Sequence, residues 1–95
     1  MNKNNQAINE LCEALTLLKN KDEMLSFLKD LCTPKEIISL SERWRVCKML
    51  NKNELSYREI HNITGVSLTT ISRVARFLKN EPNNGYNILL KKIIN

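Results

Sequence analysis

Few of the side chains that build metal sites and disulfide scaffolds occur in this 95-residue sequence. Its three cysteines, Cys12, Cys32 and Cys47, are an odd number with no close pair, and His61 is its one histidine. A structural zinc site needs four converging ligands, and a disulfide scaffold needs paired cysteines. We therefore expect no metal and no cofactor, and we interpret the three thiols as small buried apolar groups.

Long apolar runs are also missing. No run approaches the roughly 18 residues that a membrane-spanning helix requires, and residues 1–6 are polar where a secretory signal would be apolar. The sequence thus predicts a cytoplasmic protein without a membrane partner. No serine stands in a nucleophile elbow that His61 could serve, so we expect no catalytic residue and no enzyme.

Acidic residues are scarce in the second part of the chain. Residues 1–32 contain four lysines and five Asp or Glu, whereas residues 33–95 contain eleven Lys or Arg and five Glu, and the net charge is +5. This positive excess favours a polyanionic partner, which residues 33–95 would face. A chain this short buries only about 60–65% of its unfolded surface, so a homodimer is an expected source of further stability.

Helical spacing of apolar residues recurs along the chain, and no segment shows the alternation of a strand. A first helix is expected over about residues 6–19, and its apolar stripe suits a core or a dimer interface. The pattern predicts one all-α domain over residues 1–95. Its parts are N-terminal helices within 1–32 that suit a core or dimerisation, a long central helix in 33–52, a helix-turn-helix in 56–79 and a C-terminal helix in 86–94.

Two short motifs mark helix starts. Thr33 can cap a helix that has Pro34 in its first turn and Glu36 at the third position, and Ser56 and Glu59 repeat this capping-box spacing. We therefore expect helices to begin directly after Thr33 and Ser56.

The segment around Gly65 has the spacing of a helix-turn-helix. Gly65 can take the positive φ of a tight turn, and Ser67 can cap the helix that follows. The inward positions are apolar: Ile60, Val66, Ile71 and Val74. The outward positions of the second helix suit base edges and phosphates: Leu68, Thr69, Thr70, Ser72 and Arg73. His61 and Thr64 depart from the usual pattern, and an ordinary helical hairpin fits the same spacing.

An ungapped resemblance to a known family extends over about residues 25–90. The residues that carry it are Thr33-Pro34-Lys35-Glu36, Arg43, Arg45, Glu54 to Ile60, Gly65, Thr70-Ile71-Ser72-Arg73 and Leu78-Lys79. In these segments the chain resembles the bacterial tryptophan repressor family. It is still more similar to Trp-repressor-like relatives of the YerC/YecD type, in which a Leu-Cys-Thr helix entry and a Thr-Ile-Ser-Arg-Val segment recur.

The resemblance implies an all-α, intertwined, Trp-repressor-like homodimer that binds double-stranded DNA and regulates transcription, as a repressor. Two recognition helices, each over about residues 67–79, would enter successive major grooves of a palindromic operator, roughly 34 Å apart. The residues then expected to contact DNA are Arg58, His61, Ser67, Leu68, Thr69, Thr70, Ser72, Arg73, Arg76 and Lys79.

The family's tryptophan pocket is only partly retained. The resemblance places Thr33, Arg43 and Arg73 where that family holds its tryptophan ligand. Val74 and Phe77 stand where the family has a glycine and a serine, and these larger side chains would fill much of the space that an indole needs. Our hypothesis is that Phe77 substitutes for the ligand, so no small-molecule co-repressor is expected.

Other interpretations of the same residues stay open. Arg43 and Arg73 also suit an ion pair with an acid such as Glu42 or Glu59, a DNA phosphate, or a different small ligand. The basic face also suits a helical protein-interaction module or an architectural, non-specific DNA binder. Salt dependence separates these classes, because a protein that neutralises several phosphates loses affinity steeply as salt rises.

Overall fold

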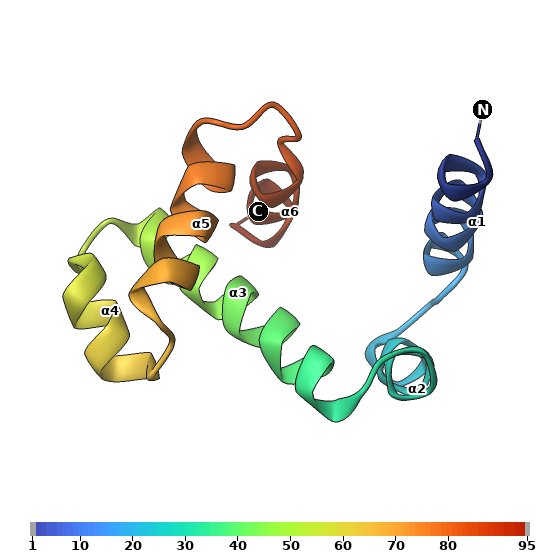
Figure 1. Ribbon diagram of the computed structural model, residues 1–95, viewed down its shortest axis with the longest axis horizontal. Helices are drawn as coiled ribbons and strands as arrows, with labels where there is room; N and C mark the ends of the chain where they lie inside the picture. The colour runs from blue at the N-terminus through green and yellow to red at the C-terminus, as the bar shows by residue number, and fades with distance from the viewer. Residues whose placement is uncertain (1, 95) are drawn as a thin grey trace. The chain divides into compact units, whose positions relative to one another are not determined.

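The computed structural model describes residues 2–94, and over this range the chain is helical with no strand, which confirms the all-α prediction (Figure 1). The helices are α1 Lys3–Thr16, α2 Lys21–Leu31, α3 Pro34–Lys52, α4 Tyr57–Thr64, α5 Leu68–Lys79 and α6 Gly85–Ile94. Within the described range, no helix combines the length and the apolar character needed to cross a membrane.

The first helix begins and ends three residues earlier than the expected 6–19. Its start is set by Asn2, whose side chain accepts a hydrogen bond from the backbone N–H of Asn5. Its end is set by the next helix, because Asn20 adopts an extended backbone and its side chain accepts from the N–H of Glu23. The N–H of Lys19 donates to the Glu23 carboxylate at 2.9 Å, so Lys19 belongs to the start of α2 and does not continue α1.

Both expected capping boxes are present. The Glu36 carboxylate accepts from the N–H of Thr33 at 2.8 Å, and the Thr33 hydroxyl accepts from the N–H of Glu36 at 3.2 Å. Ser56 and Glu59 make the same pair of bonds at 2.9 and 3.1 Å. The backbone hydrogen bond, with a smaller effect of the Thr33 or Ser56 side chain, lowers the pKa of each carboxyl group below its ordinary value of 4.5.

The fold divides into two compact units, one that ends at Ile37 and one that begins at Ile38, so α3 starts in the first and continues through the second. In the first unit, neither α1 nor α2 has a buried residue. Large apolar side chains there are open to solvent, among them Ile8, Leu11, Leu17, Leu25 and Leu31.

The second unit has a core of its own, to which α3, α4, α5 and α6 all contribute. Its buried residues are Val46, Cys47, Leu50, Ile60, Val66, Ile71, Val74, Ala75, Leu78 and Leu90. The four inward positions expected around Gly65 are all in this set, so that prediction is confirmed. The helix-turn-helix is therefore held by a continuous core and not only by its own turn.

The expectation that all three thiols are buried is wrong for Cys12 and Cys32. Cys12 is exposed, Cys32 is half-buried and only Cys47 lies in the core. Cys12 and the neighbouring Cys32 belong to the part of the chain in which neither α1 nor α2 buries a side chain. Burial raises the pKa of the Cys47 thiol from 9.0 to about 11, which makes it a poor nucleophile at neutral pH.

Candidate nucleic-acid interface and adjoining pocket

The turn between α4 and α5 is built on Gly65. Its φ of 76° lies in the left-handed region that glycine adopts without strain, and its N–H donates to the carbonyl of His61 at 2.8 Å. Val66 then enters the core, and the Ser67 side chain caps α5 by accepting from the N–H of Thr70. The local sequence thus ends one helix, reverses the chain and starts the next within three residues.

His61 and Thr64, the two departures from the usual pattern, both stabilise this turn. The Nδ1 atom of His61 lies 2.7 Å from the carbonyl oxygen of Val66, and since a carbonyl can only accept, Nδ1 is the protonated nitrogen. The Thr64 hydroxyl donates to the carbonyl of Ile60 and accepts from the N–H of Val66. Spacing alone could not reveal these roles, because such side-chain bonds to the backbone follow no apolar period.

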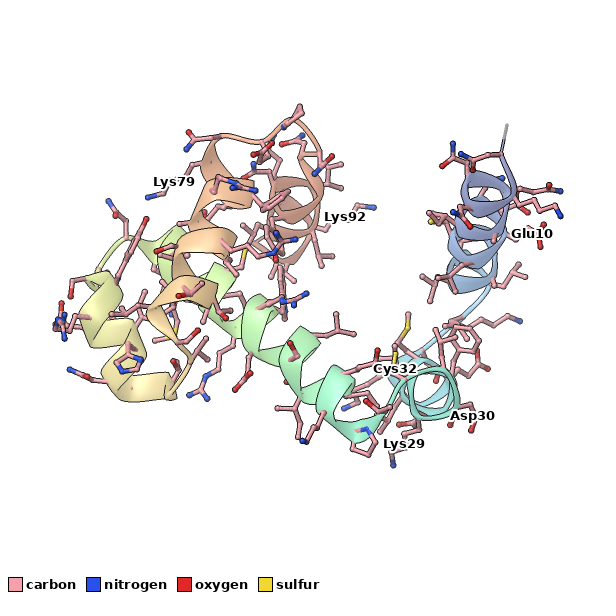
Figure 2. The ribbon with its side chains drawn as sticks, viewed as in Figure 1. Glu10, Lys29, Asp30, Cys32, Lys79 and Lys92 are labelled. Carbon is pink, nitrogen blue, oxygen red and sulfur yellow. The ribbon has the colours of Figure 1, made fainter. Side chains whose placement is uncertain are left out.

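The face of α5 that points away from the core is polar and basic. At helical spacing, Thr69, Ser72 and Arg76 run along its centre, and all three are exposed. Leu68 and Lys79 lie on one flank, and Figure 2 shows Lys79 reaching outward from the end of the helix. Ser67 and Thr70 lie at the start of α5, where their hydroxyl groups are joined by a 3.0 Å hydrogen bond.

On the other flank of α5, two arginine side chains lie against one aromatic ring. The guanidinium of Arg73 lies 4.5 Å from the centre of the Phe77 ring, and that of Arg76 lies 5.0 Å from it. Arg76 also pairs with Glu81, with 3.1 Å between Nε and Oε1. Such exposed contacts contribute only about 1 kcal/mol each, so they orient these arginines without locking them.

Charge is concentrated in the second unit. From Ile38 to the end, the sequence has ten Lys or Arg and four Glu. Arg58 is exposed on α4, while Glu59 beside it is engaged in the capping box. Of the alternatives left open for Arg43 and Arg73, an ion pair with Glu42 or Glu59 does not form: within residues 2–94, the ion pair that forms is Arg76 with Glu81.

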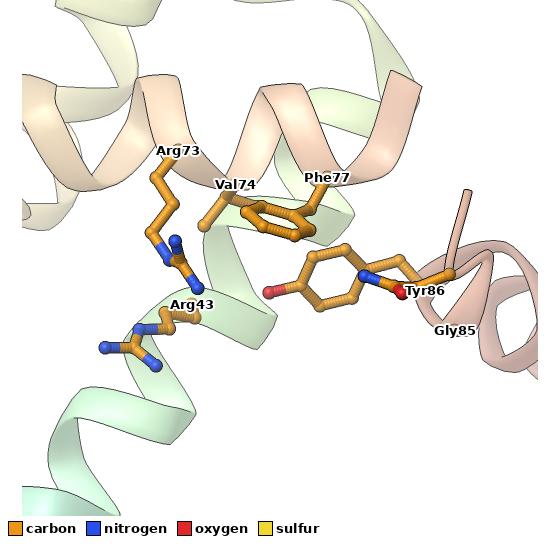
Figure 3. Close-up of a pocket in the computed structure, with 7 residues that line it drawn as sticks. Arg43, Arg73, Val74, Phe77, Gly85 and Tyr86 are labelled. Atoms are coloured by element: carbon orange, nitrogen blue, oxygen red, sulfur yellow. The ribbon is translucent and has the colours of Figure 1, made fainter. Parts of the chain in front are cut away.

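A pocket of about 370 Å³ adjoins this face, between α3, α5 and the start of α6 (Figure 3). Its lining residues are Arg43, Arg73, Val74, Phe77, Asn83, Gly85 and Tyr86. Four of the five residues expected from the resemblance are therefore brought together, whereas Thr33, at the start of α3, is not a lining residue. Whether Phe77 replaces a ligand here stays a prediction.

Three lining residues were not predicted from the sequence, Asn83, Gly85 and Tyr86, and Tyr86 has the largest side chain of the three. Figure 3 shows its ring reaching from α6 with the hydroxyl group directed toward Arg43 and Arg73. Burial raises the pKa of Tyr86 above its ordinary value of 10.0, nearby Cys47 adds to this rise, and the two arginines oppose it. The loop before α6 sets the position of Tyr86, and no spacing rule relates residue 86 to residues 43 and 73.

Comparison with known proteins agrees with this geometry. The family model described as Trp repressor protein matches residues 6–94. YerC of Bacillus subtilis (strain 168) is 38% identical over 86 residues, which cover 90% of this chain and 81% of that protein.

Two solved structures agree as well. The structure of a TrpR-like protein from Eubacterium eligens ATCC 27750 has a TM-score of 0.84 and 43% identity, covering 93% of this chain and 89% of that one. A structure from Staphylococcus aureus also has a TM-score of 0.84, with 40% identity and coverage of 94% and 87%. By sequence and by fold, the chain belongs to the Trp repressor family, among its YerC-like members.

Proposed function

We propose that this protein is a sequence-specific DNA-binding regulator that acts as a homodimer and represses transcription from a palindromic operator. The observation that carries the proposal is the outward face of α5. It is held by a buried core on one side and presents hydroxyl groups, a methyl-bearing Leu68 and basic side chains on the other. A helix of this kind suits the major groove of DNA.

The proposed contacts with DNA fall into classes that differ in their chemistry. Leu68, Thr69 and Ser72 are short enough to read base edges and thymine methyl groups. Longer basic side chains reach phosphates and set affinity: Arg58, Arg73, Arg76 and Lys79. Ser67, Thr70 and His61 lie where α5 begins, so the N-terminal end of the helix would approach the DNA backbone.

A second copy of the chain is the proposed cover for the first unit. Helices of 14 and 11 residues without buried side chains have little stability in water by themselves. Their half-buried and exposed apolar residues fall at helical spacing and would form the interface of an intertwined dimer. Two-fold symmetry would then place two copies of α5 on two half-sites.

Tryptophan is not required in the proposed mechanism. Val74, Phe77 and Tyr86 line the pocket beside Arg43 and Arg73, and we infer that these side chains give it a shape that does not fit an indole. Isothermal titration with L-tryptophan is expected to give no micromolar binding.

Selection of randomised duplex DNA at about 0.15 M salt, with and without L-tryptophan, tests the main proposal. A short palindrome is expected in both arms. Thr69→Ala and Ser72→Ala should each weaken binding to that palindrome about fivefold to tenfold and leave binding to scrambled DNA unchanged. Lys79→Ala should weaken both and lower the slope of log affinity against log salt by about one.

Ser41→Ala, at an exposed serine of α3, is the matched control and should bind like the wild type. A palindrome selected only with tryptophan would show that the pocket still takes this ligand. Equal losses in Thr69→Ala, Ser72→Ala and Lys79→Ala would indicate a non-specific binder. Failure to select any DNA would favour a protein-interaction module.

Sedimentation equilibrium tests the dimer. The wild type should sediment at twice its monomer mass of 11.1 kDa at micromolar concentration. Leu11→Asp places a charge on the apolar stripe of α1 and should raise the dissociation constant at least about tenfold. Glu10→Asp is the matched control, because it places an aspartate on the opposite face of α1 and should leave the dissociation constant unchanged. A monomeric wild type would overturn the proposed assembly.

A further inference from the structure

One wall of the pocket beside α5 is a side chain of the kind expected of a ligand. An aromatic ring that ends in a hydroxyl group, facing two guanidinium groups, reproduces the combination of flat apolar surface and polar end that small aromatic ligands present to such sites. Tyr86 supplies this combination from α6, while Arg43 comes from α3 and Arg73 from α5.

We propose that Tyr86 is an internal occupant of the space between α3, α5 and α6, where it packs on the core and forms one wall of the open pocket. It would act as a positioning residue that joins α6 to α5 and holds the recognition helix in place without an external ligand. The inference deepens the proposed function and rests on it only for the effect on DNA binding. The occupancy itself is a property of one chain.

Packing supports this assignment. Tyr86 is half-buried and packs against the core that contains Cys47, Val74 and Leu90, so the ring is covered on its inner side. α5 and α6 are in direct contact. The contact is reinforced by Asn87, whose side chain donates to the carbonyl of Leu78 at 3.1 Å. The start of α6 is thus tied to the end of α5 by a ring on one side and a hydrogen bond on the other.

The guanidinium groups of Arg43 and Arg73 explain why residue 86 is a tyrosine and not a phenylalanine. Within residues 2–94 neither arginine forms an ion pair, and both lie close enough to the phenol to oppose the rise in its pKa. A hydroxyl group in this position offers the arginines a polar neighbour where a phenylalanine would offer only carbon.

Chemical rescue tests the occupancy. Tyr86→Ala removes the ring, and at constant protein concentration it should lower the Tm by about 5–10 °C. About 10 mM p-cresol, which has the structure of the missing side chain, should restore most of this loss, because a ligand of this size binds in the millimolar range. Tyr86→Phe should keep the Tm within about 2 °C of the wild type and gain nothing from p-cresol.

Tyr57→Ala is the matched control. Tyr57 is exposed on α4, so this variant should lose little stability and should not respond to p-cresol. An equal response of Tyr57→Ala and Tyr86→Ala to p-cresol, or no response of either, would overturn the assignment.

A second measurement covers the case in which Tyr86→Ala does not fold. In the Tyr57→Phe background Tyr86 is the one remaining tyrosine, and its ionisation can be followed by phenolate absorbance near 295 nm. Arg43→Gln and Arg73→Gln should each raise the pKa of Tyr86, since each arginine now stabilises the phenolate. Arg58→Gln should leave it unchanged. An unchanged pKa in all three variants would overturn the assignment.

DNA binding gives the last readout. Tyr86→Ala should bind the selected palindrome at least about tenfold more weakly, and p-cresol should restore binding. If the wild type binds no DNA, the proposed function fails, while rescue of the Tm still decides whether Tyr86 is the occupant. If p-cresol restores the Tm but not DNA binding, the positioning role is wrong.

Discussion

α1 and α5 are amphipathic helices of 14 and 12 residues, yet α1 buries none of its side chains, whereas α5 buries Ile71, Val74, Ala75 and Leu78. Both carry apolar residues at helical spacing, so the pattern that predicts a helix does not reveal what will cover it. For α5 the cover lies in the same chain, in α3, α4 and α6. α1 and α2 have no buried residue, and we propose that a second copy covers them.

We infer from this difference that the two units have different roles. The second unit folds around its own core and can therefore hold α5, the turn at Gly65 and the pocket at Tyr86 in a fixed geometry. The first unit exposes large apolar side chains, and neither of its two complete helices has a buried residue. We expect changes in the second unit to alter DNA binding directly and changes in the first to act through assembly.

The largest expected effect is the loss of a core side chain from the second unit. Ile60 and Ile63 are both isoleucines of α4, but Ile60 is 0% exposed and Ile63 is 57% exposed. Ile60→Ala should lower the free energy of unfolding by about 2–5 kcal/mol, because it leaves a cavity. Ile63→Ala should change it by less than about 0.5 kcal/mol. Urea denaturation at one protein concentration measures both.

Equal losses in Ile60→Ala and Ile63→Ala would break the comparison between the two units. They would mean that the outer face of α4 is covered as well, so that the second unit, like the first, depends on a further surface. A loss only in Ile60→Ala would confirm that its core is self-contained.

The rate of thiol alkylation should differ about a hundredfold between Cys12 in the first unit and Cys47 in the second. Cys12 lies exposed on α1, whereas burial raises the pKa of Cys47 to about 11 and removes it from reagents. In single-cysteine variants treated with iodoacetamide at pH 8, Cys12 should react quickly at low protein concentration and more slowly as the dimer forms. Cys47 should react only after urea is added. Rapid labelling of native Cys47 would argue against a closed core.

The two glycines allow a smaller test inside the second unit. An added Cβ would meet no atom within 4 Å at Gly65 or at Gly85, so the two positions differ only in backbone conformation. Gly65→Ala should lower the free energy of unfolding by about 1–2 kcal/mol, because the φ of 76° at this position is strained for alanine. Gly85→Ala should stabilise the protein by about 0.4–1 kcal/mol, as alanine suits the first turn of α6. Similar changes in the free energy of unfolding, measured by urea denaturation, would show that the turn at Gly65 relaxes to accept alanine.

Much of the fold could be predicted from local rules. The capping boxes at Thr33 and Ser56 were specified by residue type and spacing, down to the bonded atoms. The inward positions around Gly65 followed from the helix-turn-helix pattern. These features could be foreseen because each depends on residues within one or two turns of helix.

The candidate site was only partly predictable for the opposite reason. Tyr86 reaches Arg43 and Arg73 because the loop at 80–84, with Asn84 at a φ of 62°, returns α6 to the side of α5. Long-range placement of this kind leaves no trace in apolar spacing. The exposure of Cys12 could not be predicted, because an apolar stripe indicates which face of a helix can be covered and not whether the chain covers it.

The smallest expected effect is the pH dependence of the two capping boxes. The pKa of Glu59 is lowered in the folded state, so its hydrogen bonds contribute stability that is fully present above about pH 4.5 and is lost as the pH falls through the folded value. Glu59→Gln should therefore flatten the acid side of the stability profile of the second unit, measured by urea denaturation between pH 7 and 3. Glu36→Gln, which changes the same motif in the first unit, should leave that profile unchanged and flatten only the acid-induced loss of amide protection at the start of α3. Identical profiles for the two variants would mean that α3 unfolds as one piece with the second unit, so that the boundary at Ile37 is not a boundary of cooperativity.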